Sequence, residues 1–438
     1  MKIDFNKRLY AVTNIFILYC FAFSTGMLHA GQNVEKVLTL DESINLAIAN
    51  SQQLMSEQMD VKISGQRLKE AKSGMYPQLE FNTNFSRFEA ESPLFISPIL
   101  GNTILPSKTD PNISKIENYY TAKMSFYQVL WSAGKLSATK KYAETELKTA
   151  ESNYETIRNS TVANVKKSFF RLLAIQQKLD ACNAALKEIS ELKIENTDIK
   201  NRLKSKRIIG KIDTTADNIK KDLELERVDF LDSIGAELDT TFTVVGNLAF
   251  EQKNIDLNKC LAWAVEYRPE LKKLELQEQM DALEVSLSLS GRYPTIAIGG
   301  IYQLEDTQLP FDRKSWNATV NLNLPVFDGF ALASRIKQKK YQYRKVQIYR
   351  ASVIDNIKAE VRKLYLEYDY AVKHLVKKTS DYESMPGINN ETFRNMPAYD
   401  IIEVKEILLD AKLEYIDATK NAIITKIELE NTVGKNID

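Results

Sequence analysis

Side chains that could carry out catalysis are scarce in this chain. It has two histidines, His29 and His374, and three cysteines, Cys20, Cys182 and Cys260. His374 stands alone on a coiled-coil-like pattern, and Cys182 and Cys260 fall in helical patterns, where buried free thiols are expected. The sequence contains no Ser-His-Asp set, no metal-ligand spacing and no phosphate-binding loop. We therefore expect neither an enzyme nor a resident metal or cofactor.

One pair of carboxylates has a spacing that could form a charged site. Asp400 and Glu403 are three residues apart at the start of a predicted helix, so they share one helix face. Acidic residues near a helix N-terminus also stabilise the helix dipole, which is the ordinary interpretation of such a pair. The net charge of +1 predicts no bulk attraction to nucleic acid.

The first residues have the pattern of an export signal. A basic start, an apolar run over Leu9–Phe23 and a small residue at Ala30 predict a signal peptide over residues 1–30. Lipidation at Cys20 is the competing interpretation, disfavoured because a bulky Tyr19 precedes it. No other stretch reaches the roughly 18–20 apolar residues of a membrane helix. The exported chain is then soluble in the periplasm, outside the cell, or inserted as β-strands.

The chain also contains one pattern twice, at a constant spacing. The equivalent residues are Leu40 and Leu257, Gly74 and Gly291, Tyr76 and Tyr293, and Pro77 and Pro294. Each copy predicts an amphipathic helix, a Gly-x-Tyr-Pro break, two strands and a very long helix. Such internal repetition indicates one body built from two similar units. We place the first unit at 31–250 and the second at 251–438.

Within each unit the patterns predict two strands and a helical hairpin. The first unit has strands at about 78–88 and 119–128 and a hairpin at about 132–238. The second has strands at about 295–304 and 315–325 and a hairpin at about 332–432. The first long helix is predicted from Ser132 to about Lys204, followed by a turn around Gly210 and a return helix from about Thr215. The second turn is predicted at Met385–Pro397.

The strands alternate between apolar and polar residues. The clearest is the fourth, where Trp316, Ala318, Val320 and Leu322 oppose amide and hydroxyl side chains. This pattern is typical of a transmembrane barrel strand with a wet lumen, although a small half-buried sheet under helices fits any single strand as well. The N–H and C=O groups at an open sheet edge find no hydrogen-bond partners in lipid, and small barrels need about eight strands. Several chains would therefore have to share one barrel.

In this order the motifs resemble the outer membrane efflux protein family typified by TolC. The resemblance covers nearly all of the chain beyond the signal. The motifs that carry it are Leu38-Thr39-Leu40-Asp41-Glu42-Ser43, Gly74-Met75-Tyr76-Pro77, Leu130-Trp131-Ser132-Ala133-Gly134, Arg268-Pro269-Glu270-Leu271, Gly291-Arg292-Tyr293-Pro294, Pro325-Val326-Phe327-Asp328-Gly329 and Leu429-Glu430-Asn431-Thr432-Val433-Gly434.

The resemblance implies a mainly α protein with membrane β-structure. Three chains would form a trimeric twelve-strand outer-membrane β-barrel, continued through the periplasm by an α-helical barrel. It also implies a passive exit duct for efflux or type I secretion. Its partners would be two further copies, outer-membrane lipid, a periplasmic adaptor (membrane fusion) protein and an inner-membrane pump of the RND or ABC type.

The family also implies roles for named residues. The positions that match its periplasmic gate, a ring of carboxylates with cation selectivity, are Asp400 and Glu403. In the first hairpin, Lys206, Gly210 and Ile212 match its adaptor-docking tip.

The second hairpin departs from the family pattern. Arg394 stands where the family usually has Gly, and Met396 stands where a basic residue can lock the closed entrance. These two departures leave undecided which adaptor binds and how strongly the closed state is held. The alternative function is a periplasmic coiled-coil protein with a structural or adhesive role, and the outer face of the strands distinguishes the two.

Overall fold

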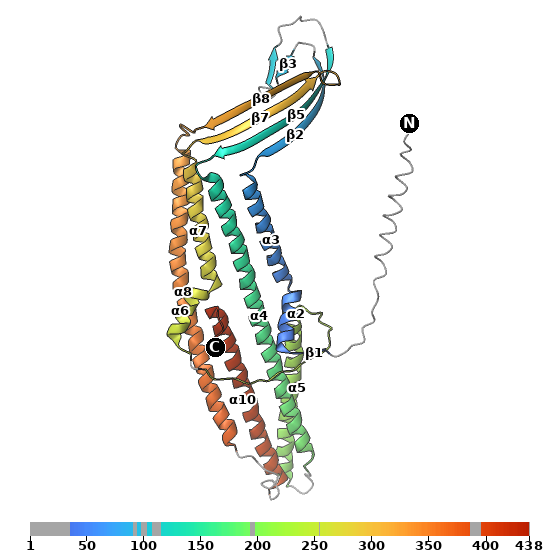
Figure 1. Cartoon of the computed structure of the whole chain (residues 1–438). Coiled ribbons are helices and arrows are strands. Elements are labelled where there is room, and N and C mark those ends of the chain that lie inside the picture. The colour runs from blue at the N-terminus through green and yellow to red at the C-terminus, as the bar shows by residue number, and fades with distance from the viewer. Residues whose placement is uncertain are drawn as a thin grey trace, which may run out of the picture.

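The computed structural model describes residues 36–90, 94–97, 103–106, 115–192, 198–253, 255–385 and 396–437. The molecule is elongated, with a sheet at one end and long helices below it (Figure 1). The predicted signal peptide, including Cys20 and His29, lies outside the described residues. Among the helices that the structure describes, none combines the length and apolar character needed to cross a membrane.

The chain runs twice through short helices, strands and a helical hairpin. The helices are α2 (Leu40–Asn50), α3 (Gln52–Ser73), α4 (Lys135–Ser190), α5 (Ile199–Ile234), α6 (Leu257–Tyr267), α7 (Pro269–Ser290), α8 (Ala331–Ser384) and α10 (Ala398–Val433). The strands are β1 (Lys36–Leu38), β2 (Gln78–Ala90), β3 (Leu94–Ser97), β4 (Thr103–Pro106), β5 (Lys115–Trp131), β6 (Phe242–Val244), β7 (Thr295–Asp306) and β8 (Arg313–Asn323).

Each amphipathic helix before a Gly-x-Tyr-Pro break is divided in two. Between α2 and α3, the Ser51 hydroxyl accepts a hydrogen bond from the Leu54 N–H at 3.2 Å and caps the second helix. Between α6 and α7, Arg268 is extended and Pro269 takes the first helical position, which proline tolerates because no N–H is needed there. Ordinary capping residues therefore account for both divisions.

The large sheet has the antiparallel order β2-β5-β7-β8, so the middle pair joins the two units. Two smaller pairs accompany it: β1 with β6, parallel, and β3 with β4, antiparallel. The strands β2 and β8 are the outer members of the large sheet, and among the described strands each pairs along one side only.

The helices stand side by side beneath the sheet (Figure 1). In the upper half the order of contacts is α3, α4, α7, α8. In the lower half α4 packs against α5 and α10, and α10 packs against α8. Thus α4, α7 and α10 are inner helices with neighbours on both sides, whereas α3, α5 and α8 lie at the edges.

The hydrophobic core lies midway along the helices. One cluster joins β1, β6 and α2 to α4, α5 and α10 around Phe169 and Phe230. A second joins α6, α7, α8 and α10 around Val361 and Leu429. A third lies lower, where α4, α5 and α10 meet at Cys182, and is made of small and aliphatic side chains. Burial raises the pKa of the free thiols of Cys182 and Cys260, as expected for inert core residues.

The predicted turn of the first hairpin is wrong. Helix α4 ends at Ser190, and α5 already begins at Ile199, so one helix runs through the positions assigned to the turn. Glycine weakens a helix by about 1 kcal/mol but does not have to end it, and Gly210 has no left-handed backbone. The burial of Ile212 and Ala216 against the third cluster outweighs that cost. At 56 residues, α4 is shorter than the helix predicted from Ser132 to about Lys204 and spans about 84 Å.

Candidate channel surfaces and entrance

The large sheet has one apolar face and one polar face, because all four strands share a register. One row across the four strands on the first face is formed by Phe81, Met124, Tyr302 and Trp316. The adjacent row on the other face is formed by Asn82, Lys123, Gln303 and Ser315. The alternation predicted for each strand therefore adds up to two continuous surfaces of opposite character.

The apolar face is uncovered in the single chain. The four residues of its first row are between 47 and 75 % exposed. No described helix packs on the sheet, since the strands contact mainly one another. An exposed apolar surface of this extent requires an apolar environment or a partner, whereas the opposite face can line water.

The predicted gate residues lie at the far end of the molecule, at the base of α10. Asp400 is in the first turn and Glu403 one turn further, on either side of the buried pair Ile401 and Ile402. Neither carboxylate forms an ion pair within the part of the chain that the structure describes. Because Ile401 and Ile402 attach this turn to the other helices, the two carboxylates are left available for solvent or ions.

The neighbouring charges on α10 are instead paired with other helices. Lys211 of α5 donates to Glu406 at 2.7 Å and to Asp410 at 3.2 Å, and the carboxylates raise its pKa. Lys405 pairs with Glu188 of α4. These contacts fix the base of α10 against the first hairpin and distinguish Asp400 and Glu403 from the acids one or two turns above them.

A second charged layer lies higher on α10. Asp417 pairs with Lys178 of α4 and with Lys420 at 2.8 Å. Burial alone would raise the pKa of Asp417, but the two ammonium groups outweigh it and lower the pKa. The ionised pair therefore joins α4 to α10 between the middle and lower clusters.

The structure separates the predicted docking residues of the first hairpin from its tip. Lys206, Gly210 and Ile212 lie two to four turns inside α5, and Ile212 is buried. Lys206 and Gly210 are exposed on the side of the helix. Any docking role of these residues therefore belongs to a helix flank. The residue types Asn196, Thr197 and Asp198, which favour turns and helix starts, were the sequence signal for the true tip.

The second hairpin turns where the sequence predicts, between Ser384 and Ala398. Arg394 lies outside the described residues. Met396 is half-exposed and immediately precedes Pro397, the N-cap residue of α10. His374 is exposed on α8 and stacks on Tyr370 with ring centroids 6.4 Å apart.

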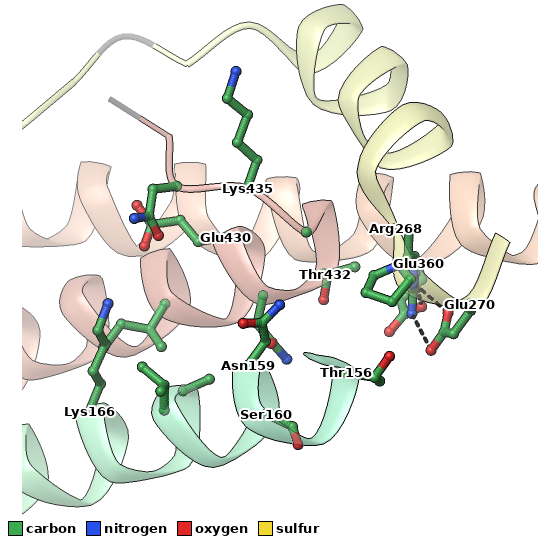
Figure 2. A pocket seen from close by; sticks show the side chains of 17 residues that line it. Thr156, Asn159, Ser160, Lys166, Arg268, Glu270, Glu360, Glu430, Thr432 and Lys435 are labelled. Carbon is green, nitrogen blue, oxygen red and sulfur yellow. Dashed lines mark hydrogen bonds and ion pairs between the residues drawn. The ribbon is translucent and has the colours of Figure 1, made fainter. Parts of the chain in front are cut away.

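A polar cavity of about 420 Å³ lies midway, between α4, the start of α7, α8 and the end of α10. Figure 2 shows Arg268, Glu270 and Glu360 gathered at one side of it. The Arg268 guanidinium pairs with Glu270 at 2.6 Å and Glu360 at 2.7 Å, so its charge is compensated inside the protein. At the end of α10, Gly434 has a positive φ, and a Cβ there would lie 2.9 Å from the Tyr267 carbonyl oxygen. The cavity is thus part of a tight joint between helices.

No group of three or more His, Cys, Asp or Glu side chains that could hold a metal occurs among the described residues. The described geometry is that of a two-faced sheet, a long helical wall and a charged base. Sequence patterns located the sheet and the base, but not the ion pairs that hold the wall together.

Comparison with known proteins identifies the class. The family model described as outer membrane efflux protein matches residues 43–192 and 262–376. The chain therefore belongs to the outer membrane efflux protein family, as the motifs predict. It is of the class of efflux channels that lie in the outer membrane and extend into the periplasm.

Solved structures share the fold at low sequence identity. The CmeC outer membrane channel of Campylobacter jejuni is 15 % identical, over 91 % of this chain and 86 % of that chain, with a TM-score of 0.68. The open MtrE outer membrane channel of Neisseria gonorrhoeae is 14 % identical, over 91 % and 89 %, with a TM-score of 0.66. The outer membrane protein VceC of Vibrio cholerae is 13 % identical, over 91 % and 97 %, with a TM-score of 0.64. No curated protein matches the sequence.

Proposed function

We propose that three copies of the chain share one twelve-strand barrel in the outer membrane. The observation that carries this proposal is the sheet, with its exposed apolar face and two strands paired along one side only. In lipid an open edge leaves N–H and C=O groups without partners. Four strands cannot close a barrel, so β2 of one copy pairs with β8 of the next.

The edge helices support the same assembly. Each carries exposed apolar residues at helical spacing, whereas the inner helices carry almost none. They are Met55, Met59 and Ile63 on α3, Ile199, Leu203, Leu225 and Val228 on α5, and Tyr341, Ile348, Leu366 and Tyr370 on α8. Placing α8 of one copy beside α3 and α5 of the next covers both edges and closes a helical tunnel below the barrel.

The assembled protein is a passive exit duct that catalyses nothing. It serves a tripartite efflux or type I secretion system, in which an inner-membrane pump of the RND or ABC type delivers cargo through a periplasmic adaptor. The adaptor binds the hairpins, along the α5 flank with Lys206 and Gly210 and near Arg394 and Met396. Residues 1–30 are the export signal, and the units 31–250 and 251–438 each supply two strands and one hairpin.

The base of the tunnel is its gate. Three copies of Asp400 and Glu403 place six carboxylates around the entrance. Such a ring attracts cations and repels anions. The absence of ion pairs at both positions among the described residues supports this role over a purely structural one.

The native mass of protein extracted from outer membranes in mild detergent tests the assembly. The expected result is a trimer. A monomer, or a protein released without detergent, would mean that the strands close no barrel, and would favour a periplasmic scaffold or adhesin instead.

Single-channel recording tests the gate. The variant Asp400→Asn with Glu403→Gln should lose most of its preference for cations. The matched control is Asp60→Asn with Glu57→Gln, which has the same spacing on α3, far from the base. Unchanged selectivity in the first variant, or an equal loss in the control, would exclude the carboxylate ring.

A further inference from the structure

The sheet meets the helices at two equivalent junctions. The first junction comprises residues 72–77 and 128–141, and the second comprises the equivalent residues 289–294 and 324–337. A Cβ on Gly74 would lie 3.3 Å from Leu136, and one on Gly291 would lie 3.1 Å from Leu332. In each junction, therefore, the end of a short helix packs on the start of a long one directly below the strands.

Both junctions are basic. The first contains Lys72, Lys135, Lys140 and Lys141 and no acidic residue, although Lys140 is paired with Glu144 just beyond it at 3.4 Å. The second contains Arg292, Arg335 and Lys337, with one acid, Asp328. The Asp328 carboxylate accepts the Leu332 N–H at 2.6 Å and so is used in starting α8.

Exposed cations without an ion pair in the described ranges also occur lower on the helices, as at Lys62, Lys148, Lys273 and Arg362, so what distinguishes the junctions is their scarcity of acids. Lys72, Lys135, Arg292, Arg335 and Lys337 are all exposed, and none forms an ion pair within the described ranges. Other cations lower on the helices, Lys178, Lys211, Lys339 and Lys378, are paired with acids on neighbouring helices. The opposite end of the sheet, residues 305–314, contains three acids and two cations. Cations therefore outnumber acids in the junctions on the helix side of the strands, whereas acids outnumber cations in the connection between β7 and β8 at the opposite end.

Exposed aromatic rings accompany the cations in both junctions. They are Tyr76 and Trp131 in the first, and Tyr293, Phe327 and Phe330 in the second. Phe330 is 72 % exposed and has a φ of 68°, a conformation that is unfavourable for a bulky residue. Phe327 packs on it edge to face at 5.7 Å. A glycine would adopt this backbone more easily, so holding an exposed ring here has a use other than folding.

We infer that the two junctions bind the headgroups of anionic phospholipids in the membrane leaflet nearest the helices. The inference rests on the proposed membrane barrel. Trp and Tyr rings favour the headgroup level of a bilayer, and Lys and Arg at that level attract anionic lipids.

Continuity with the apolar face favours lipid as the partner. Trp131 lies opposite Ile296, and Ile296 lies opposite Leu322, so the apolar surface reaches the edge of both junctions. A bilayer that covers this face places its headgroups on the cations. In a trimer the pattern repeats at six junctions, which makes a basic ring that sets the depth of the barrel.

The test compares lipid retention after reconstitution into vesicles with equal parts of phosphatidylcholine and phosphatidylglycerol. The trimer is extracted in mild detergent and its bound lipids are counted by native mass spectrometry. The test variant combines Lys72→Gln, Lys135→Gln, Arg292→Gln and Arg335→Gln. The matched control combines Lys62→Gln, Lys148→Gln, Lys273→Gln and Arg362→Gln, which are exposed cations on α3, α4, α7 and α8, away from the junctions.

The wild type and the control should retain phosphatidylglycerol preferentially, and the test variant should not. Each cation near an anionic surface favours binding by about fivefold at low salt. Wild-type retention should also fall in 1 M salt, where the screening length is about 3 Å. This measurement needs no variant and holds even if the test variant does not fold.

Three results would overturn the inference. They are equal lipid ratios in the test variant and the wild type, a preference that survives high salt, or a variant that loses only its trimer and so points to contact between copies. Failure of the wild type to insert into vesicles of phosphatidylcholine alone would instead count against the proposed barrel.

Discussion

Helices α4 and α8 occupy equivalent places in the two units but differ in their surroundings. They have 56 and 54 residues, and both carry apolar residues at helical spacing. The fully described α4 exposes no large hydrophobic side chain, whereas α8 exposes Tyr341, Ile348, Tyr349, Leu366, Tyr370 and Val376. Since α4 has helices on both sides and α8 on one side only, the exposed residues mark the place of a missing neighbour.

The spacing on α8 makes the contrast sharper. Tyr341, Ile348, Leu366 and Tyr370 fall on one narrow stripe, because their separations are close to multiples of 3.6 residues. The buried residues Val361 and Tyr368 fall on the opposite side of the helix. One helix thus has two apolar faces, of which the single chain covers one.

The largest expected effect comes from placing charges on the uncovered stripe. Leu366→Glu with Tyr370→Glu should abolish the trimer, because uncompensated charges in an interface cost several kcal/mol each. The control, Lys340→Glu with Ala351→Glu, changes two exposed positions of α8 outside the stripe. Native mass in detergent separates the outcomes, and a trimer that survives in the first variant would remove the basis of the comparison.

The next largest effect is expected from truncating a buried side chain of α4. Phe169 of α4 is 1 % exposed in the central cluster, and Phe169→Ala should lower the free energy of unfolding by about 3–5 kcal/mol. Tyr370→Ala should change it by less than about 0.5 kcal/mol in dissociated chains. Urea titration followed by helical circular dichroism measures both. Equal losses would mean that α4 and α8 are equally packed within one chain.

A smaller effect, a gain in stability, is expected from a substitution on the inner helix α7. Asp281 of α7 is 3 % exposed, its Oδ2 has no hydrogen bond, and burial raises its pKa. Its ionised form is therefore unfavourable in the folded state at neutral pH. Asp281→Asn should raise the free energy of unfolding by about 1 kcal/mol, with the gain shrinking as pH falls through the raised pKa. Asp60→Asn, exposed on α3, is the control, and a loss of stability at Asp281 would contradict the interpretation.

The smallest effect concerns the ion pairs between α4 and α10. Because the pKa of Asp417 is lowered in the folded state, its pairing contributes stability above the unfolded pKa of about 3.9. That contribution is lost as pH falls through the folded pKa. Asp417→Asn should cost at most about 1 kcal/mol at pH 7, since the side chain is partly solvent-screened. Unfolding curves at several pH values give the free energy of unfolding as a function of pH, which should fall less steeply towards acid pH in the variant than in the wild type. Equal slopes would mean that other groups cause the acid sensitivity.

The strands and most helices were predictable because their signals are local. Alternation located all four large strands to within a few residues, and Pro386, Gly387 and Pro397 located the second turn. The first turn was misplaced because a glycine inside a helix resembles a glycine that ends one. Its true position lacks glycine and proline altogether, and only turn-favouring polar residues mark it.

The base was predictable in position but not in detail. The spacing of Asp400 and Glu403 put them on one helix face, whereas the pairs that surround them join residues far apart in the chain. Lys211 and Glu406 are separated by 195 positions, and Lys178 and Asp417 by 239. No local pattern reports such partners, because helix packing decides which of many exposed charges meet.

The shared register of the sheet also determines where the chain tolerates extra residues. Adding one residue within β8 would turn every later side chain of that strand to the opposite face. The segment Thr307–Asp312 between β7 and β8 can lengthen without this consequence, which makes it the natural site for an epitope tag. Strand β5 does contain one extra residue, between Val129 and Trp131. This residue lies close to the end of the pairing with β7, so few side chains after it change face. Insertions and deletions during evolution should therefore gather at the ends of the strands.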